Sequence, residues 1–285
     1  MALHAETPEW RDTVKVLIVY FSATGNTKYG AELVQFGIEQ TEGTRCDCVP
    51  IHRFAGGMVF EYDLIGFACP VFAYKPPLNM LALIQNLPDG GGKPCFTFVS
   101  YAGALSNTFW ILKTELEKRN YVCLAQKEML AQGSWTTERA PGRIHYENEP
   151  SAVTQKGIIA FGKELPGVFE RYINSGHMEA SPAFRLGFRH IISWFYNDFI
   201  LEHFFTTKVN LDRCTNCGLC VKRCPTGRMH YDRFPNPKGK CVGCYQCINR
   251  CPENAVEGWL TKGKIRYKGL SPAIKLLKKD SDETR

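Results

Sequence analysis

Apolar runs and amphipathic stretches alternate along the first 175 residues of the chain. Runs with the length of buried strands begin at residue 14 and recur at 46–51, 62–69, 94–100 and 122–130. Stretches of helical period lie between and after them, at 28–40, 77–87, 107–120 and 151–173. Strands that alternate with helices predict a parallel, doubly wound α/β sheet.

A stripe of large apolar residues follows this region. The residues Phe184, Phe188, Ile191, Phe195 and Phe199 are separated by steps of 4, 3, 4 and 4, which places them on one face of a helix. We expect a connecting helix that packs this face between two domains. The alternative is a helix that docks on a membrane surface or a partner, which the few lysines on its polar face disfavour.

Two cysteine runs near the C-terminus carry the strongest chemical signal. The pattern C-x2-C-x2-C-x3-C-P occupies residues 214–225 and recurs 27 residues later at 241–252. Three close thiolates bind one [4Fe–4S] cluster, and the fourth cysteine ligates the other cluster. The expected ligand sets are therefore Cys214, Cys217, Cys220 and Cys251 for one cluster, and Cys241, Cys244, Cys247 and Cys224 for the other.

A pair of zinc sites is the alternative interpretation of these cysteines. Structural zinc takes four ligands, and it uses neither the third cysteine of each run nor the Cys-Pro ending. The chain has 13 cysteines in all. The other five are expected to be buried free thiols in a reducing compartment: Cys46, Cys48, Cys69, Cys95 and Cys123.

Charge and targeting patterns narrow the functional classes. The formal net charge is +7. Each oxidised cluster with its thiolates brings about −2, and a flavin phosphate lowers the total further to about +1. A general attraction to nucleic acid is therefore not expected. With no apolar leader in residues 1–13 and no apolar run of membrane length, the expected location is the cytoplasm.

A hydroxyl-rich loop follows the first predicted strand and precedes a helix. Free N–H groups at a helix start, with hydroxyls beside them, form a phosphate site. The loop residues are Ser22, Ala23, Thr24, Gly25, Asn26 and Thr27. The chain contains neither a G-x-x-x-x-G-K-[ST] motif nor a G-x-G-x-x-G motif. No nicotinamide site is expected, so electrons should come from another protein.

The S-x-T-G-N-T sequence of this loop resembles the FMN-phosphate loop of flavodoxins. Together with the cysteine runs, it makes the chain similar to flavodoxin–ferredoxin fusion proteins of anaerobes, over residues 14–175 and 208–258. This resemblance implies a five-stranded sheet of order 2-1-3-4-5 with FMN at the switch point between strands 1 and 3. It also implies a small α+β domain with two [4Fe–4S] clusters.

The resemblance implies a flavin-ring site at the ends of strands 3 and 4. The expected residues are Pro70, Val71, Phe72, Ala73 and Tyr74, followed by Ser100, Tyr101, Ala102 and Gly103. We expect at least one of Phe72, Tyr74 and Tyr101 to touch the ring. The polar segment 132–150 is expected to lie over the flavin, and its His145 and Tyr146 are weaker candidates for proton donors.

Five segments follow from these patterns. They are an N-terminal extension (1–13), a flavodoxin-like FMN domain (14–177), an aromatic connecting helix (178–207), a 2[4Fe–4S] ferredoxin domain (208–258) and a basic, solvated C-terminal tail (259–285). The expected function is electron transfer between FMN and the clusters, linking one-electron carriers to a partner redox protein. The alternative is an FMN-dependent reductase of a quinone, a nitro compound or dioxygen.

Overall fold

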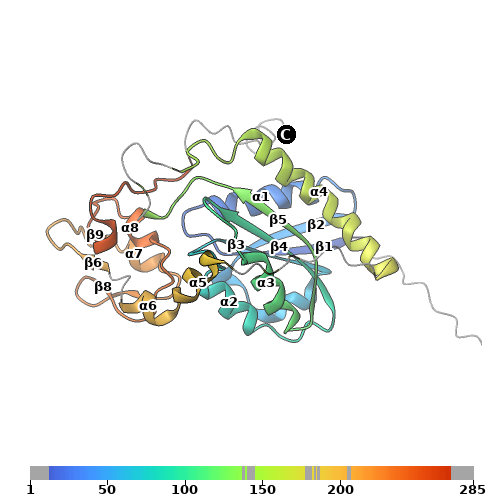
Figure 1. Cartoon of the computed structure of the whole chain (residues 1–285), viewed down its shortest axis with the longest axis horizontal. Coiled ribbons are helices and arrows are strands. Elements are labelled where there is room, and N and C mark those ends of the chain that lie inside the picture. Colours follow the sequence, from blue (N-terminus) through green and yellow to red (C-terminus); the bar gives the residue numbers. More distant parts are fainter. Residues whose placement is uncertain are drawn as a thin grey trace, which may run out of the picture.

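A five-stranded parallel sheet forms the centre of the N-terminal region (Figure 1). The computed structural model describes residues 13–136, 139, 145–176, 182, 184, 187–203 and 207–270. The strands are β1 (Val14–Tyr20), β2 (Thr44–Pro50), β3 (Leu64–Pro70), β4 (Lys93–Tyr101) and β5 (Tyr121–Leu130). Their order is β2-β1-β3-β4-β5, and every neighbouring pair is parallel. The predicted doubly wound, flavodoxin-like sheet is confirmed.

Helices cover both faces of this sheet (Figure 1). One face carries α1 (Asn26–Ile38) and α4 (Ala152–Ser175), and the other carries α2 (Leu78–Gln85) and α3 (Thr108–Glu117). All four helices begin and end within three residues of the predicted bounds. The short 3-10 helices η1 (Ile51–Arg53) and η2 (Gly56–Glu61) join β2 to β3, and no sequence pattern indicated them.

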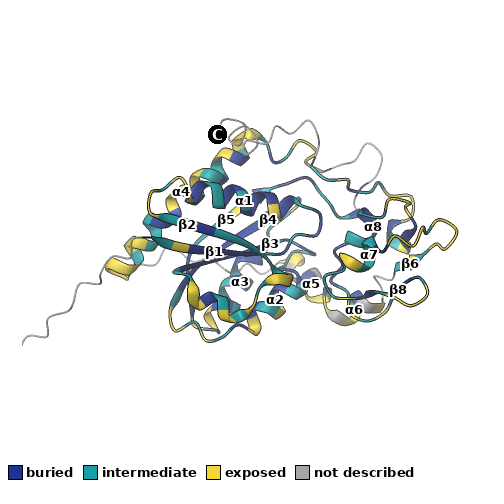
Figure 2. Cartoon of the chain, turned by 180° about the vertical axis from the view of Figure 1, so that it is seen from behind, coloured by how far each residue is buried: buried dark blue, intermediate teal, exposed yellow. Residues whose placement is uncertain are grey.

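Two hydrophobic cores lie on either side of the sheet. All but the last residue of β3 are buried, as a strand covered on both faces requires. Figure 2 shows buried residues gathered along the sheet and exposed residues on the outer sides of the helices. The carboxyl ends of β1, β3 and β4 are thereby presented by a rigid, close-packed frame.

Two glycines bring α1 and α4 into backbone contact. A Cβ atom on Gly37 would lie 2.2 Å from the carbonyl oxygen of Ile159, and one on Gly162 would lie 2.3 Å from that of Val34. Neither position has room for a side chain unless the helices separate. The register of α4 against α1 is therefore fixed close to the end of α1.

The cysteine-rich region is a small α+β unit beside the sheet (Figure 1). Strands β6 (Thr207–Val209) and β9 (Val256–Gly258) form one antiparallel pair, and β7 (Met229–Tyr231) and β8 (Pro235–Pro237) form another. Each cysteine run contains one short helix, α7 (Leu219–Lys222) or α8 (Gln246–Asn249), and η4 (Trp259–Thr261) follows β9. Met229, Tyr245, Ile248 and Val256 form its core.

The predicted connecting helix is wrong in extent and in burial. Two helices are present, α5 (Phe188–Phe195) and α6 (Asp198–His203), and Phe184 lies outside both. Phe188, Phe195 and Phe199 are 76%, 54% and 64% exposed, so these three residues of the stripe do not pack between domains. The buried residue is instead Tyr196, whose hydroxyl donates to the carbonyl of Val242.

The predicted solvated tail holds for Lys262, Lys264 and Lys268, which are exposed, but not for Arg266 and Tyr267. Tyr267 is 1% exposed, and the Arg266 guanidinium donates to the carbonyls of Asn254 and Val256 at 3.0 and 2.9 Å. Residues 265–267 therefore pack against the rest of the chain, and the lysines around them face solvent. Residues 1–12 and 271–285 lie outside the described residues. No helix in the described ranges is long and apolar enough to cross a membrane.

Candidate functional site

The loop between β1 and α1 has the backbone geometry of an anion site. Gly25 precedes α1 with a left-handed φ of 115°, a conformation that glycine adopts without steric cost. Its N–H donates to Ser22 Oγ at 3.1 Å, and its carbonyl accepts from the N–H of Tyr29 at 2.9 Å. The first turn of α1 contains no acidic residue. The free N–H groups and the positive end of the helix dipole therefore favour a phosphate here.

The threonine hydroxyls of this loop are buried within it. Thr24 and Thr27 are both buried, and Thr27 Oγ1 forms a 2.7 Å hydrogen bond with Ser100 Oγ. This bond ties the loop after β1 to the end of β4. We expected both threonines to donate to the phosphate, and that role stays a prediction.

A cavity of about 290 Å³ lies at the carboxyl ends of the strands. It is lined by Ser22, Ala23, Thr24, Asn26, Thr27, Pro70, Val71, Phe72, Ala73, Tyr74, Ser100, Tyr101, Ala102, Gly103, Ala104, Ala131, Gln132, Gly133, Ser134 and Trp135. Of the residues expected to bind FMN, all but Gly25 line it. We refer to this space as the flavin cavity.

The flavin cavity has the polar and apolar parts that a flavin mononucleotide needs. The hydroxyls of the loop after β1 lie on one side, and aromatic side chains lie at the ends of β3 and β4 and in the loop after β5. The buried Gln132 Oε1 lines it and has no hydrogen-bond partner among the described residues. A bound ring with an N–H group would supply the missing donor. These residues therefore fit the cofactor.

The three aromatic candidates have different environments. Phe72 is buried in the core, with its ring centroid 6.1 Å from Phe21 and 5.9 Å from Trp135. Tyr74 has a left-handed φ of 67°, and the Arg189 guanidinium lies 5.9 Å from its ring. Tyr101 is half-buried, and this burial raises the pKa of its hydroxyl. Tyr74 and Tyr101 remain our predicted ring contacts, whereas Phe72 supports the cavity wall.

Sequence reasoning missed Trp135 as an individual site residue. It belongs to the segment 132–150, whose first four residues line the flavin cavity as expected. Neither His145 nor Tyr146 lines that cavity, so their suggested role as proton donors has no geometric support. A lone tryptophan in a polar loop gives no local signal of function.

The eight cysteines of the two runs line two small cavities. Each cavity has three cysteines from one run and the fourth from the other. The inner cysteine site is lined by Cys224, Cys241, Cys244 and Cys247. The outer cysteine site is lined by Cys214, Cys217, Cys220 and Cys251. These are the two sets that the spacing predicts, and their ligation of iron remains a proposal.

Backbone amides orient several of the sulfurs. The N–H groups of Gly243 and Met229 donate to Cys241 Sγ and Cys224 Sγ at 3.3 and 3.4 Å. Such donors favour the thiolate that a metal requires. Burial raises the pKa of the Cys244 thiol to about 12, so metal binding has to displace a proton. Among the described residues, no group of three or more His, Cys, Asp or Glu side chains is arranged to hold a single metal ion.

Comparisons with known proteins bear on both halves. Residues 213–256 match the family model described as a 4Fe-4S dicluster domain. No curated protein matches the chain. A flavodoxin from the domain Archaea is 16% identical, with 55% of this chain and 99% of that chain covered and a TM-score of 0.41.

Two further solved structures are similar to the N-terminal half. A two-electron reduced flavodoxin of Megasphaera elsdenii is 17% identical, with 52% of this chain and 98% of that chain covered and a TM-score of 0.37. Rubredoxin oxygen:oxidoreductase from Desulfovibrio gigas is 9% identical, with 58% and 38% covered and a TM-score of 0.43. The flavodoxin-like fold rests on the strand order and helix layers given above.

The matched 4Fe-4S segment contains both cysteine runs, and the sheet before it has flavodoxin order. The chain fits a flavodoxin–ferredoxin fusion. The zinc alternative is accordingly not supported. Below, the ferredoxin domain means residues 207–270 as the structure describes them, and the flavodoxin domain means residues 13–176.

The two domains of the fusion meet beside the flavin cavity. Trp135 of the flavodoxin domain lines that cavity, and its ring centroid lies 5.9 Å from Tyr245 at an interplanar angle of 87°. Tyr245 stands between Cys244 and Cys247 and lines the inner cysteine site. One edge-to-face aromatic pair therefore joins the wall of the flavin cavity to the wall of the inner site.

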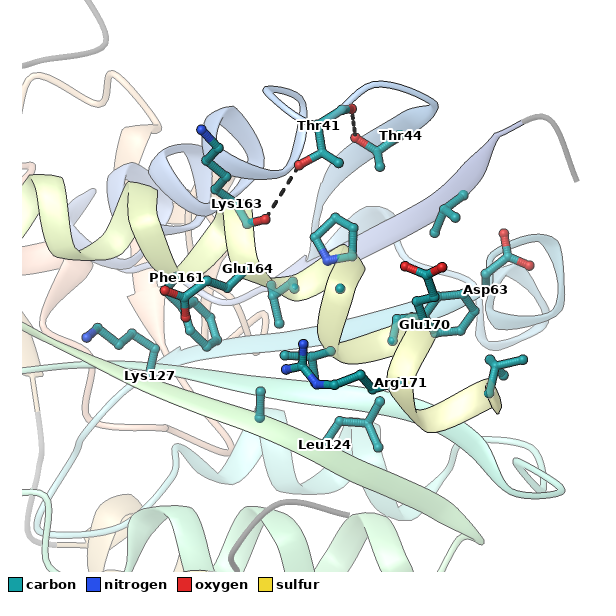
Figure 3. A pocket seen from close by; sticks show the side chains of 18 of the residues that line it. Thr41, Thr44, Asp63, Leu124, Lys127, Phe161, Lys163, Glu164, Glu170 and Arg171 are labelled. Atoms are coloured by element: carbon teal, nitrogen blue, oxygen red, sulfur yellow. Dashed lines mark hydrogen bonds between the residues drawn. The ribbon is translucent and has the colours of Figure 1, made fainter. Parts of the chain in front are cut away.

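A larger cavity of about 1320 Å³ lies at the other end of the flavodoxin sheet (Figure 3). Acidic and basic residues line it together, among them Asp63, Lys127, Glu164 and Arg171. Neither the phosphate loop nor any residue of the two cysteine runs contributes to it. Open α/β sheets bind ligands at the carboxyl ends of their strands, so this cavity is not the redox site.

Proposed function

We propose that this flavodoxin–ferredoxin fusion transfers electrons between FMN in the flavin cavity and [4Fe–4S] clusters at the inner and outer cysteine sites. Through this relay it links one-electron carriers to a partner redox protein. The observation that supports this most directly is the Trp135–Tyr245 contact, because it joins the two cofactor cavities within one chain. When bound, FMN exchanges one or two electrons, whereas iron–sulfur clusters exchange one.

The protein's own residues position the cofactors and exclude water between them. The phosphate loop holds the nucleotide end, and Gln132 offers an acceptor inside the cavity. Cys241 and Cys244 belong to the same hydrophobic cluster as Phe72 and Trp135. The path between the flavin cavity and the inner site is therefore packed with side chains, which keeps the cofactors at a fixed separation.

The two cysteine sites differ in their access to solvent. Cys217 of the outer site is exposed, whereas Cys244 of the inner site is buried. We infer the order partner, outer site, inner site, flavin for electrons entering the chain, and the reverse order for electrons leaving it. An external redox protein would accordingly dock over the outer site.

The test begins with the cofactors themselves. Protein purified under argon should contain FMN, about eight irons and about eight sulfides per chain. A one-electron donor is then mixed with the loaded protein in a stopped-flow instrument, and cluster and flavin absorbance are followed together. The clusters should be reduced first and the flavin should bleach afterwards, at a rate independent of protein concentration.

Two tryptophan variants test the path. Trp135→Leu removes the ring between the two cavities and should slow flavin bleaching in protein that has been loaded with FMN and iron to the wild-type level. Trp259→Leu, at an exposed position of the ferredoxin domain, is the matched control and should leave the rate unchanged. Flavin that stays oxidised while the clusters are reduced, in the wild-type protein, would rule out the internal relay. Rapid reoxidation of the reduced flavin by a quinone or nitro compound in the absence of any protein partner, seen as recovery of the flavin absorbance, would favour the reductase alternative.

A further inference from the structure

The ferredoxin domain holds two of the loops that line the flavin cavity. Arg250 donates from Nη2 to the carbonyl of Thr24, in the phosphate loop, at 2.8 Å. Asn249 donates from Nδ2 to the carbonyl of Ser134 at 3.1 Å and accepts from Thr136 Oγ1 at 2.9 Å. The phosphate loop and the loop after β5 are thus both attached to two consecutive residues of the second cysteine run.

Tyr267 adds a third attachment from the ferredoxin side. Its hydroxyl donates to Asn26 Oδ1, and Asn26 Nδ2 donates in turn to the carbonyl of Gln132 at 2.9 Å. The backbone N–H of Tyr267 donates to Asn249 Oδ1 at 2.9 Å. Asn249 and Tyr267 are 2% and 1% exposed, so water cannot replace these hydrogen bonds.

The charge of Arg250 lies close to the phosphate loop. Its Nη2 is 3.9 Å from the point where a Cβ of Gly25 would stand. Its Nε is buried and has no hydrogen-bond partner among the described residues. A guanidinium held there both fixes the Thr24–Gly25 peptide and favours negative charge in the loop.

The same short segment carries a cysteine of each cluster site. Asn249 and Arg250 lie between Cys247, which lines the inner site, and Cys251, which lines the outer site. A cluster bound at either site restrains one end of this segment. The hydrogen bonds that hold the flavin loops therefore depend on a turn that both clusters help to order.

We propose that the ferredoxin domain completes the flavin site, with Asn249, Arg250 and Tyr267 as positioning residues, so that cluster binding and FMN binding strengthen each other. This inference rests on the proposed function, because it assumes that both kinds of cofactor bind. Because the two binding equilibria are coupled by one free energy, clusters should strengthen FMN binding by the same factor by which FMN strengthens cluster binding. The flavodoxin domain alone is then an incomplete FMN protein.

Flavin titration of the full chain tests the proposal. FMN and riboflavin are titrated under argon into protein with clusters and into protein expressed without iron, and dissociation constants are taken from flavin fluorescence. The loaded protein should bind FMN about tenfold more tightly than the iron-free protein, as expected from the loss of a hydrogen bond or two to the loops. Equal affinities would overturn the proposal.

Two variants test the positioning residues in protein that keeps its clusters. Arg250→Gln should weaken FMN binding about tenfold, and riboflavin binding much less, because riboflavin lacks the phosphate. The matched control is Arg223→Gln, at the corresponding position of the first run, where the side chain is exposed and should have no effect on either flavin. Equal loss of both flavins in Arg250→Gln would overturn the phosphate-specific role.

Tyr267→Phe removes only a hydroxyl, and residue 267 lies well away from the cysteines in sequence. It should weaken FMN binding several-fold while the iron content stays at the wild-type level. Tyr231→Phe, whose hydroxyl bonds to the carbonyl of Asn216 beside the outer site, is its control and should bind FMN normally. Wild-type affinity in both Arg250→Gln and Tyr267→Phe would overturn the proposal. Failure of the wild-type protein to bind FMN at all would instead reject the proposed function.

Discussion

The two cysteine sites share one sequence pattern and occupy different surroundings. The outer site has an exposed Cys217, and the residues after its run of three, Lys222 and Arg223, are exposed too. In the inner site Cys244 is buried, and Asn249 and Arg250, at the corresponding positions, bond to the flavodoxin domain. Cysteine spacing thus determines which four sulfurs line each site, and the residues between the cysteines determine whether that site is exposed to solvent or packed against the flavodoxin domain.

The position after the second cysteine of each run shows this difference most clearly. Both residues there precede a short helix in the left-handed conformation, Gly218 with φ 72° and Tyr245 with φ 54°. Glycine adopts this conformation freely, whereas a bulky residue is strained in it. Tyr245 tolerates the strain because its ring is buried against Trp135. The inner site therefore contacts the flavodoxin domain through an aromatic ring at this position, whereas at Gly218 of the outer site the Tyr231 side chain fills the space that a side chain would need.

Removal of the exchanged cysteines should have the largest effect. Cys224→Ser should lose the inner cluster, about four of the eight irons, although Cys224 belongs to the run that supplies the outer site. Cys251→Ser should lose the outer cluster instead. Iron analysis and EPR of the two anaerobically purified variants distinguish these outcomes. Loss of the outer cluster in Cys224→Ser would contradict the exchange of ligands.

Sequence patterns predict the sheet, its four helices and the two cysteine sets because each depends on neighbours in the chain or on a repeated spacing. The attachments between domains have no such signature. Asn249 and Ser134 are 115 residues apart, Arg250 and Thr24 are 226 apart, and Tyr267 and Asn26 are 241 apart. A single hydrogen bond over that separation leaves no periodicity to detect.

The aromatic stripe was misjudged for a different physical reason. Helical spacing identifies an apolar face, but it does not say what covers that face. The chain leaves α5 at Phe195, and the next residue, Tyr196, turns inward to reach Val242. The buried contact is therefore made by a residue that lies off the predicted stripe.

An exchange at the left-handed positions should have an intermediate effect. Tyr245→Gly relieves backbone strain of about 1–2 kcal/mol but loses a buried aromatic side chain worth about 3–5 kcal/mol. The net loss of about 2 kcal/mol should lower the melting temperature of the loaded protein. Gly218→Ala should cost about 1–2 kcal/mol through backbone strain, and more through the clash of its Cβ, which would lie 2.1 Å from the Tyr231 hydroxyl oxygen. A Tyr245→Gly protein that melts above wild type would show that the Trp135 contact contributes nothing to stability.

Truncation of the exposed stripe should have the smallest effect. Phe188→Ala and Phe195→Ala remove side chains that are mostly in solvent, so each should change the free energy of unfolding by less than about 0.5 kcal/mol. Cluster and flavin contents should stay at wild-type levels. Tyr196→Ala is the buried comparison and should be clearly destabilising. A melting temperature several degrees lower in the Phe188→Ala, Phe195→Ala double variant would show that this face is covered after all.

The glycine contact between α1 and α4 ties the position of α1 to that of α4. Gly37 touches the backbone of α4 near one end of α1, and Asn26 stands at the other end, about 16 Å away along the helix axis. An added methyl group at Gly37 or Gly162 would meet backbone atoms of the other helix, so the two helices would have to separate there. Because Thr27 of α1 bonds to Ser100, a displacement of α1 disturbs the contacts of the phosphate loop. A distant methyl group should therefore weaken the proposed flavin binding while every residue that lines the cavity stays unchanged.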